Sequence, residues 1–424
     1  MIGTMGTGML LAVAALAAEP MPQVLTLDQA LKTAAERQPQ LRQAAAATAA
    51  SQARADQSRA ALLPQLRLSA GYDRGTNNRA GVPPYSFASS DAWNAAVSAN
   101  QLVWDFGQTW NRWQAAGAQA EAQASNEQSS RLQAAFNVRS AFFTAHGDKA
   151  LVEVARETLG NQERHLQQIQ GFVRVGTRPE IDLAQARTDL ANARLLLVNA
   201  ENAYDLARAQ LNQAMGVEGS LEYDVADNQA PVVEGEDGTT DELLKQALSV
   251  RPEVAALDQQ VRAQELTVSA VSGGYWPSLG VGATVSEGGP RLDGLAWNWS
   301  LGPTLSWSFF EGGRTSAAVR ESRAQLDSLH AQVDDLRQSV RLDVEQARLA
   351  IRASKAALAA AADAATNARE RLKLAEGRYQ AGVGNAIELG DAQVALTSAL
   401  AQKVQADQRL ASSRAQLLRA LGRP

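Results

Sequence analysis

The residue types that enzymes use for covalent or metal chemistry are scarce in this chain of 424 residues. It contains no cysteine, and its three histidines, His146, His165 and His330, are scattered along the sequence. Thiol catalysis, disulfides, cysteine-held metals and a lipid-modified cysteine are therefore excluded, and a histidine-rich metal site is not expected.

Phosphate loops and nucleic-acid surfaces also find little support. Gly273-Gly274 and Gly312-Gly313 lack the G-x-x-x-x-G-K-[ST] frame of a phosphate loop, and no nucleophile stands at a persuasive spacing from a base. The net charge of −5 gives no broad basic surface for a phosphate backbone. We predict a protein that is not an enzyme, uses no cofactor or metal and does not bind nucleic acid.

One acidic pair has a spacing that matters on a helix. Glu388 and Asp391 are three positions apart, so a helix carries both carboxylates on one face. Spacing alone favours an ordinary solvated helix surface for this pair. Any further role has to come from the elements that hold it.

The chain carries one pattern twice. A helix start with a capping box, Thr26 with Gln29, recurs as Thr239 with Glu242. Further matches keep one constant offset before the loop Gly75–Ser90 and a second constant offset after it: Pro39 with Pro252, Pro64 with Pro277, Gly107 with Gly313, Gly176 with Gly382, Leu183 with Leu389, and Gly216 with Gly422. These matches indicate a duplicated unit of helix, two strands, long helix and shorter helix.

The duplication predicts the domain organisation. Residues 18–216 form the first repeat, 217–240 a linker and 241–424 the second repeat. Residues 1–17 are predicted to be a secretory signal peptide, because an apolar run ends in the small-x-small signal Ala15-Leu16-Ala17. No Lys or Arg precedes this run, which leaves the translation start open, and a buried N-terminal helix is the alternative.

Two long helices are predicted where proline is absent and Ala, Gln, Leu, Glu and Arg dominate. They span about Ala115–Val175 and Ser316–Ala381, and the first is expected to be about 90 Å long. The shorter helix after each has the heptad seam of a coiled coil, with Ala or Ser three positions after each large residue. The large positions are Leu183, Leu190, Leu197, Tyr204 and Leu211, then Leu389, Leu396, Lys403, Leu410 and Leu417.

Four segments alternate apolar and polar residues with the period of a β-strand. They are Leu66–Tyr72, Trp93–Asn100, Leu279–Ser286 and Trp297–Phe309, with a bulge or bend expected at Pro303. All eight tryptophans lie within 93–113 or 276–307, and none is expected in the long helices. Two-faced strands with aromatic ends are typical of outer-membrane barrels, which predicts a membrane girdle of Trp93, Trp104, Trp297, Trp299 and Trp307.

Four strands are too few to close a barrel, and bare strand edges are not stable in lipid. The chain is therefore expected to oligomerise, and the strand count alone leaves two, three or four copies open. The alternative is a soluble periplasmic coiled-coil spacer or adaptor that carries a small sheet.

The chain resembles the outer-membrane efflux family, the TolC-like ducts of Gram-negative bacteria. The resemblance rests on TLDQALKTAAERQPQLRQA (26–44), LLPQLRLSAGY (62–72), VGTRPEIDLAQAR (175–187), FFEGGR (309–314) and RYQAGVGNAIELGDAQ (378–393). It implies a mixed fold: a homotrimer with a twelve-stranded transmembrane β-barrel and a periplasmic α-barrel of long antiparallel coiled coils. It also implies a passive exit duct of an efflux or type I secretion system. The partners would be outer-membrane lipid, a periplasmic adaptor (membrane fusion) protein and an inner-membrane pump of RND, ABC or MFS type.

The resemblance further assigns roles to residues near two helix turns. Glu388 and Asp391 match the acidic rings of the family's periplasmic constriction, and Asp182, the repeat counterpart of Glu388, is expected to brace it. The family's basic latch position is Gly384 here, whereas Arg178 stands in the first repeat, so the latch is expected to differ. Adaptor docking is expected at the turns, with simple helix termination as the alternative, and involves Val175, Gly176, Thr177, Ala381, Gly382 and Val383.

Overall fold

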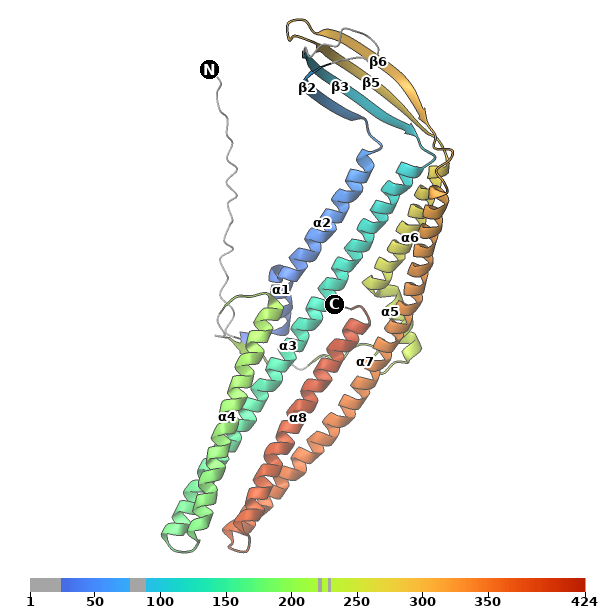
Figure 1. Cartoon of the computed structure of the whole chain (residues 1–424). Coiled ribbons are helices and arrows are strands. Elements are labelled where there is room, and N and C mark those ends of the chain that lie inside the picture. The colour runs from blue at the N-terminus through green and yellow to red at the C-terminus, as the bar shows by residue number, and fades with distance from the viewer. Residues whose placement is uncertain (1–23, 77–88, 220–222, 228–229, 424) are drawn as a thin grey trace. The chain divides into compact units, whose positions relative to one another are not determined.

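The computed structural model of the chain describes residues 24–76, 89–219, 223–227 and 230–423. The predicted signal peptide, 1–17, and most of the loop Gly75–Ser90 lie outside the described residues. Figure 1 shows the elements, which are β1 (Val24–Leu25), α1 (Leu27–Arg37), α2 (Pro39–Ala60), β2 (Gln65–Gly75), β3 (Ser90–Trp104), α3 (Gln108–Arg174), α4 (Glu180–Met215), β4 (Asp224–Val225), α5 (Thr240–Val250), α6 (Pro252–Ser272), the 3-10 turn η1 (Gly273–Tyr275), β5 (Ser278–Gly289), β6 (Ala296–Ser306), α7 (Arg314–Gln380) and α8 (Ala386–Ala420).

The chain forms two compact units, and each is discontinuous in sequence. Within the described residues, the first unit comprises residues up to 36, 138–229 and 361–408, and the second comprises 37–137, 230–360 and the residues from 409 onward. Each unit therefore takes segments from both predicted repeats. The domain boundaries at 17, 216 and 240 remain a prediction.

The two long helices have equal length. Helices α3 and α7 have 67 residues each, about 100 Å of helix, and α4 and α8 have 36 and 35 residues. None of the helices in the described part of the chain is apolar enough over a sufficient length to cross a membrane.

Helix α3 begins earlier than the sequence suggested. The Asp105 carboxylate accepts a hydrogen bond from the Thr109 amide at 2.7 Å, which satisfies a free N–H of the first turn and fixes the start of the helix at Gln108. Trp110 and Trp113 consequently lie inside a long helix. The prediction that the long helices contain no tryptophan is therefore wrong.

Glycines that match between the two repeats share their backbone conformation. Their φ angles are 80° and 87° at Gly107 and Gly313, 76° and 76° at Gly176 and Gly382, and 69° and 69° at Gly216 and Gly422. Positive φ values of this size are strained for residues with a side chain and are common where a helix ends. Corresponding strands and helices of the two repeats thus end or begin with the same local geometry.

The four long strands form one antiparallel sheet in the order β2-β3-β5-β6. Its register brings the alternating positions of all four strands into common rows. One row consists of Leu68, Val97, Val285 and Trp299, and the next consists of Arg67, Ser98, Thr284 and Ser300. Because neighbouring rows point to opposite faces, the sheet is apolar on one face and polar on the other from edge to edge.

A bulge or bend was expected at Pro303, and the prediction of a bulge is wrong. Pro303 pairs with Val281 in an unbroken register between β5 and β6. Strand β6 is an edge of the described sheet, where a missing backbone N–H is tolerated without loss of the ladder. The register shift lies instead in β3, between Leu102 and Trp104, where this strand pairs with β5.

Both predicted capping boxes are confirmed. The Gln29 amide donates to Thr26 Oγ1 at 3.3 Å, and the Thr26 amide donates to Gln29 Oε1 at 3.0 Å. The corresponding distances at Thr239 and Glu242 are 3.4 Å and 3.2 Å. These pairs satisfy free N–H groups where α1 and α5 begin.

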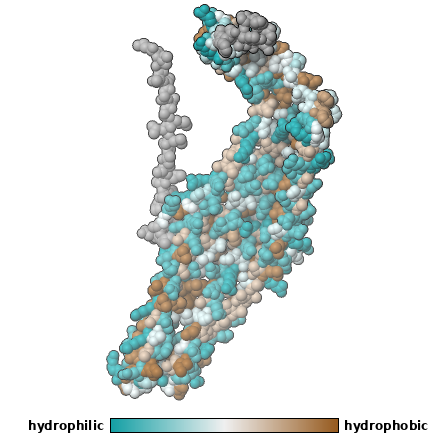
Figure 2. Space-filling model, viewed as in Figure 1, coloured by the Kyte–Doolittle hydropathy of each residue, from teal (hydrophilic) through white to brown (hydrophobic). Residues whose placement is uncertain are grey.

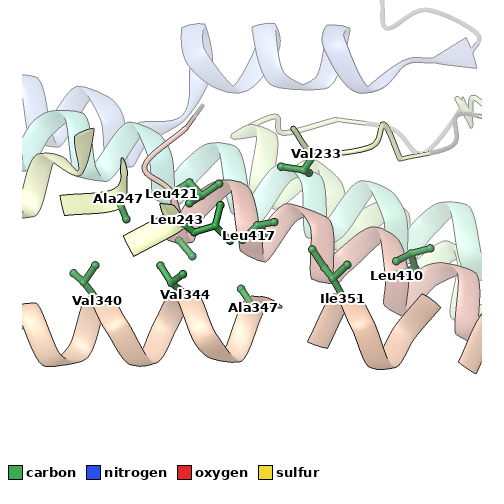
Figure 3. Close-up of a cluster of buried hydrophobic side chains, with 11 residues drawn as sticks. Val233, Leu243, Ala247, Val340, Val344, Ala347, Ile351, Leu410, Leu417 and Leu421 are labelled. Atoms are coloured by element: carbon green, nitrogen blue, oxygen red, sulfur yellow. The ribbon is translucent and has the colours of Figure 1, made fainter. Parts of the chain in front are cut away.

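An apolar cluster in the second unit joins the predicted linker to three helices. Figure 3 shows Val233, side chains of α5, the α7 stripe Val340-Val344-Ile351 and the end of α8 pointing toward one another. The three α7 residues are at most 1% exposed, and Leu417 of α8 is fully buried. Burial of this apolar surface is the main stabilising term for the packing of this unit.

A buried carboxylate holds the same segment. Glu236 is 5% exposed, accepts a hydrogen bond from Arg414 Nε at 3.0 Å, and lies 2.7 Å from Lys355 Nζ. Burial by itself raises the pKa of Glu236, but the hydrogen bonds from Arg414 and Lys355 lower that pKa to about 2. The end of the predicted linker is therefore held by charged side chains of α7 and α8.

Candidate functional site

Two tight turns of the first unit join α3 to α4 and α7 to α8 (Figure 1). In each, the glycine amide donates to the carbonyl three residues back, and the next amide donates to the carbonyl five residues back, at 3.0–3.1 Å. This pattern requires the positive φ of Gly176 and Gly382. The neighbouring Val175 and Val383 are 70% and 71% exposed, and Ala381 is also exposed. Thr177 adds a side-chain hydrogen bond to the end of α3.

Arg178 follows the first turn and reaches the second. Its Nη2 donates to the Gly384 carbonyl at 3.4 Å, and its guanidinium lies 4.5 Å from the centre of the Tyr379 ring. Gly384 has no room for a side chain, because a Cβ there would lie 2.9 Å from the Tyr379 nitrogen and 3.1 Å from the Arg378 carbonyl carbon. A basic side chain at position 384 therefore does not fit this turn, and the first repeat supplies one instead.

The ring that Arg178 covers belongs to a buried cluster. Tyr379 is 2% exposed and packs against the rings of His165, at 5.8 Å, and Phe172, at 6.3 Å. Burial raises the pKa of the Tyr379 hydroxyl and lowers the pKa of His165, while the carboxylates of Asp189 and Asp182 oppose the latter shift. The two turns are thus tied to a packed core that sequence reasoning did not identify.

The predicted acidic pair is divided between two environments. Glu388 lies 3.4 Å from the Arg378 Nε, and its amide donates to Asn385 Oδ1 at 2.7 Å. Asp391 is exposed and lines a groove between α4 and α8, together with Asp182. The structure therefore brings Asp391 and Asp182 to one site, whereas Glu388 makes an ion pair at the turn.

The groove between α4 and α8 has a volume of about 820 Å³. Asp189, which also lines it, was missed by the sequence analysis, although it stands one heptad after Asp182. Side chains of α3 complete the groove, and there Gln162 donates to Gln393 Oε1 of α8 at 2.9 Å. Apolar side chains gather over α4 in Figure 2, and Leu196 is one that lines the groove.

The tryptophans of the predicted girdle lie in or next to the strands of the sheet, and most of them are exposed. Trp297 and Trp299 are 67% and 66% exposed, and Trp104 and Trp307 are also exposed. Trp93 is half-buried, and its ring packs against the tilted ring of Tyr72 with 4.5 Å between the ring centres. Trp307 lies just beyond the end of β6, where its indole N–H donates to the Tyr275 carbonyl at 3.2 Å. The exposed tryptophans thus occur near both ends of β6.

The family model described as outer membrane efflux protein matches residues 30–217 and 243–423. The chain belongs to this family. It is 26% identical over 371 residues to a probable efflux pump outer membrane protein, SepC of Pseudomonas putida, with 86% of this chain and 76% of SepC covered.

Solved structures agree with the fold of an efflux protein. VceC, an outer membrane protein of Vibrio cholerae, superposes with a TM-score of 0.81 at 18% identity and covers 93% of this chain and 96% of its own. The Campylobacter jejuni outer membrane channel CmeC gives a TM-score of 0.82 at 16% identity, with 93% and 85% covered.

Membership of the family establishes the cellular location and the function of the protein. It is an outer-membrane efflux channel protein of the Gram-negative envelope that extends into the periplasm. The family is one of channels and not of enzymes. The alternative of a soluble periplasmic spacer is therefore set aside.

Proposed function

We propose that three copies of the chain close a twelve-stranded barrel in the outer membrane and continue into the periplasm as a helical duct. The apolar face of the four-stranded sheet carries this proposal. Leu66, Leu68, Trp299, Leu301 and Leu305 on that face are all at least 65% exposed. Within the described residues, β2 and β6 also have unpaired outer edges. Lipid covers such a face, and only neighbouring copies can pair such edges inside a membrane.

The proposed partners are a periplasmic adaptor and an inner-membrane pump of RND, ABC or MFS type, since the duct itself has no energy source. SepC is named as part of an efflux pump, which favours this assignment. The adaptor would dock at the exposed turns around Val175, Gly176, Thr177, Ala381, Gly382 and Val383. Exposed valines beside rigid glycine turns present apolar surface at a fixed position, which suits docking.

The proposed gate lies beside the same turns. Arg178 acts as the latch through Gly384 and Tyr379, and Glu388, Asp391 and Asp182 supply negative charge at the constriction. In a trimer, these carboxylates would recur three times around a narrow passage. Rings of carboxylates favour cations over anions.

Disulfide cross-linking between β2 and β6 of neighbouring copies tests the assembly. Ser69→Cys is combined in turn with Asn298→Cys, Ser300→Cys or Thr304→Cys. Because the chain has no native cysteine, any disulfide in these variants joins two introduced cysteines. We expect one of these pairs to give a ladder of cross-linked species that ends at three copies. A ladder that ends at two or four copies contradicts the trimer. Ser69→Cys with Ala96→Cys, which are paired within one chain, is the control and should give no ladder.

Neutralising the acidic pair tests the charge of the gate. Glu388→Gln combined with Asp391→Asn should weaken cation preference in a planar bilayer, because the carboxylates that attract cations are removed. Conductance should rise, because the ion pair between Glu388 and Arg378 at the turn is lost. The matched control is Asp407→Asn on α8, an exposed residue of the same helix. Unchanged conductance and unchanged ion selectivity in the double variant remove both residues from the gate.

A further inference from the structure

The groove between α4 and α8 has unbalanced negative charge. Asp182, Asp189 and Asp391 line it, and none of the three makes an ion pair within the described residues. No Lys, Arg or His is among its lining residues in the described part of the chain. Asp182 and Asp189 are two helical turns apart, about 10 Å along the axis. The groove therefore offers a cation several separated carboxylates and no competing positive group.

A metal ion is a poor occupant for this arrangement. Within the described residues, no group of three His, Asp or Glu side chains is placed to hold a metal ion. The walls between the carboxylates are also apolar. Ile181 and Ile387, which correspond in the two repeats, are both 73% exposed, and Val394 is 69% exposed. Burial of these apolar side chains against an apolar ligand is favourable, whereas they provide no polar ligands for a hydrated ion.

A buried amide supplies independent evidence for a ligand. Gln162 is 8% exposed and lines the groove, and its Nε2 donates to Gln393 Oε1 at 2.9 Å. Its own Oε1 is buried and has no hydrogen-bond partner. A buried acceptor without a donor is costly, and an N–H group of a ligand would satisfy it.

We propose that this groove binds a protonated amine with an apolar body, an amphiphilic ammonium compound of drug size. Pockets of about 300–1,000 Å³ hold ligands of that size, and this groove has about 820 Å³. One of the carboxylates pairs with the ammonium, the isoleucines and Val394 cover the apolar body, and Gln162 accepts an N–H. The proposal rests on the proposed efflux function, because the amines that bind in the groove are taken to be compounds that the duct exports.

Paired probes of opposite charge test the site. The full-length protein in lipid nanodiscs is titrated with naphthylbutylammonium and with naphthylbutanoate, and binding is followed by naphthyl fluorescence anisotropy after subtraction of empty nanodiscs. We expect saturable binding of the ammonium probe alone. The Asp182→Asn/Asp189→Asn variant should bind it about tenfold more weakly, since the ammonium loses its ion pair with whichever of the two carboxylates it contacts. Ile387→Ser should weaken binding about fivefold through lost apolar contact.

The control is Asp407→Asn on α8, which lies outside the groove and should leave the dissociation constant unchanged. Equal binding of naphthylbutanoate overturns the proposal, as does an unchanged affinity in the double aspartate variant. Absence of ammonium binding also overturns the proposal. That result is expected if a second copy of the chain fills the groove. Conductance of the same protein in a planar bilayer separates this failure from failure of the duct, because the duct conducts whether or not the groove binds amines.

Discussion

Replacement of Arg178 by alanine should open the duct at its periplasmic end. The substitution removes the hydrogen bond to the Gly384 carbonyl and the contact with the Tyr379 ring. A charge-assisted hydrogen bond and a cation–π contact are together worth about 2 kcal/mol. A loss of that size raises the ratio of open to closed tips about thirtyfold. Single-channel conductance in planar bilayers is the measurement, and the variant should spend far longer in high-conductance states.

Two further variants make this result specific. Arg178→Lys keeps a cation over the ring but loses the planar guanidinium, so it should open less than alanine does. Arg187→Ala, an exposed position of α4, should conduct like the unmodified protein. A closed Arg178→Ala channel, or equal opening by Arg187→Ala, rejects Arg178 as the latch.

Replacement of Glu236 by glutamine should destabilise the second unit by about 3 kcal/mol, because two cations lose a buried partner. The contacts concerned are those of Arg414 and Lys355. Urea unfolding of the detergent-solubilised protein, followed by circular dichroism, measures the loss. The matched control is Glu234→Gln, whose side chain is 91% exposed and makes an ion pair with Arg423. A change below about 0.5 kcal/mol is expected there.

The acid dependence of stability provides a second readout of Glu236. Its folded-state pKa of about 2 lies below the ordinary value of 4.5. Its contribution to stability is therefore fully present above pH 4.5 and is lost as the pH falls toward 2. The Glu236→Gln variant should lose less stability than the unmodified protein over that interval. Parallel acid curves for the two proteins contradict the assigned role of the carboxylate.

Local signals made much of the fold predictable. Capping boxes, glycines at helix ends and two-residue alternation each depend on neighbouring residues, and all three predictions are confirmed in detail. The two errors arose where a feature outside the residue pattern decides the outcome. Pro303 is tolerated because β6 is an edge strand, and Trp110 is helical because Asp105 caps the turn before it. Neither fact is visible in the period of the pattern.

The candidate site was less predictable because its contacts join segments far apart in the sequence. Arg178 was singled out, but its Gly384 carbonyl partner belongs to the other repeat. Glu236 stood in a segment that looked like a linker, and no spacing rule pairs it with Arg414. Asp189 is the exception, since its heptad relation to Asp182 was available in the sequence.

The discontinuous make-up of the two units sets an order of events during biogenesis. Val233 packs in one cluster with Leu417 and Leu421, which follow it by more than 180 residues in the sequence. The second unit therefore cannot bury this cluster until the segment that begins at residue 409 has been added to the chain and has folded back onto residues 230–360. Until then, the apolar stripe Val340-Val344-Ile351 of α7 lacks the α8 side chains that cover it. Exposed apolar surface of this kind makes a folding intermediate prone to aggregation.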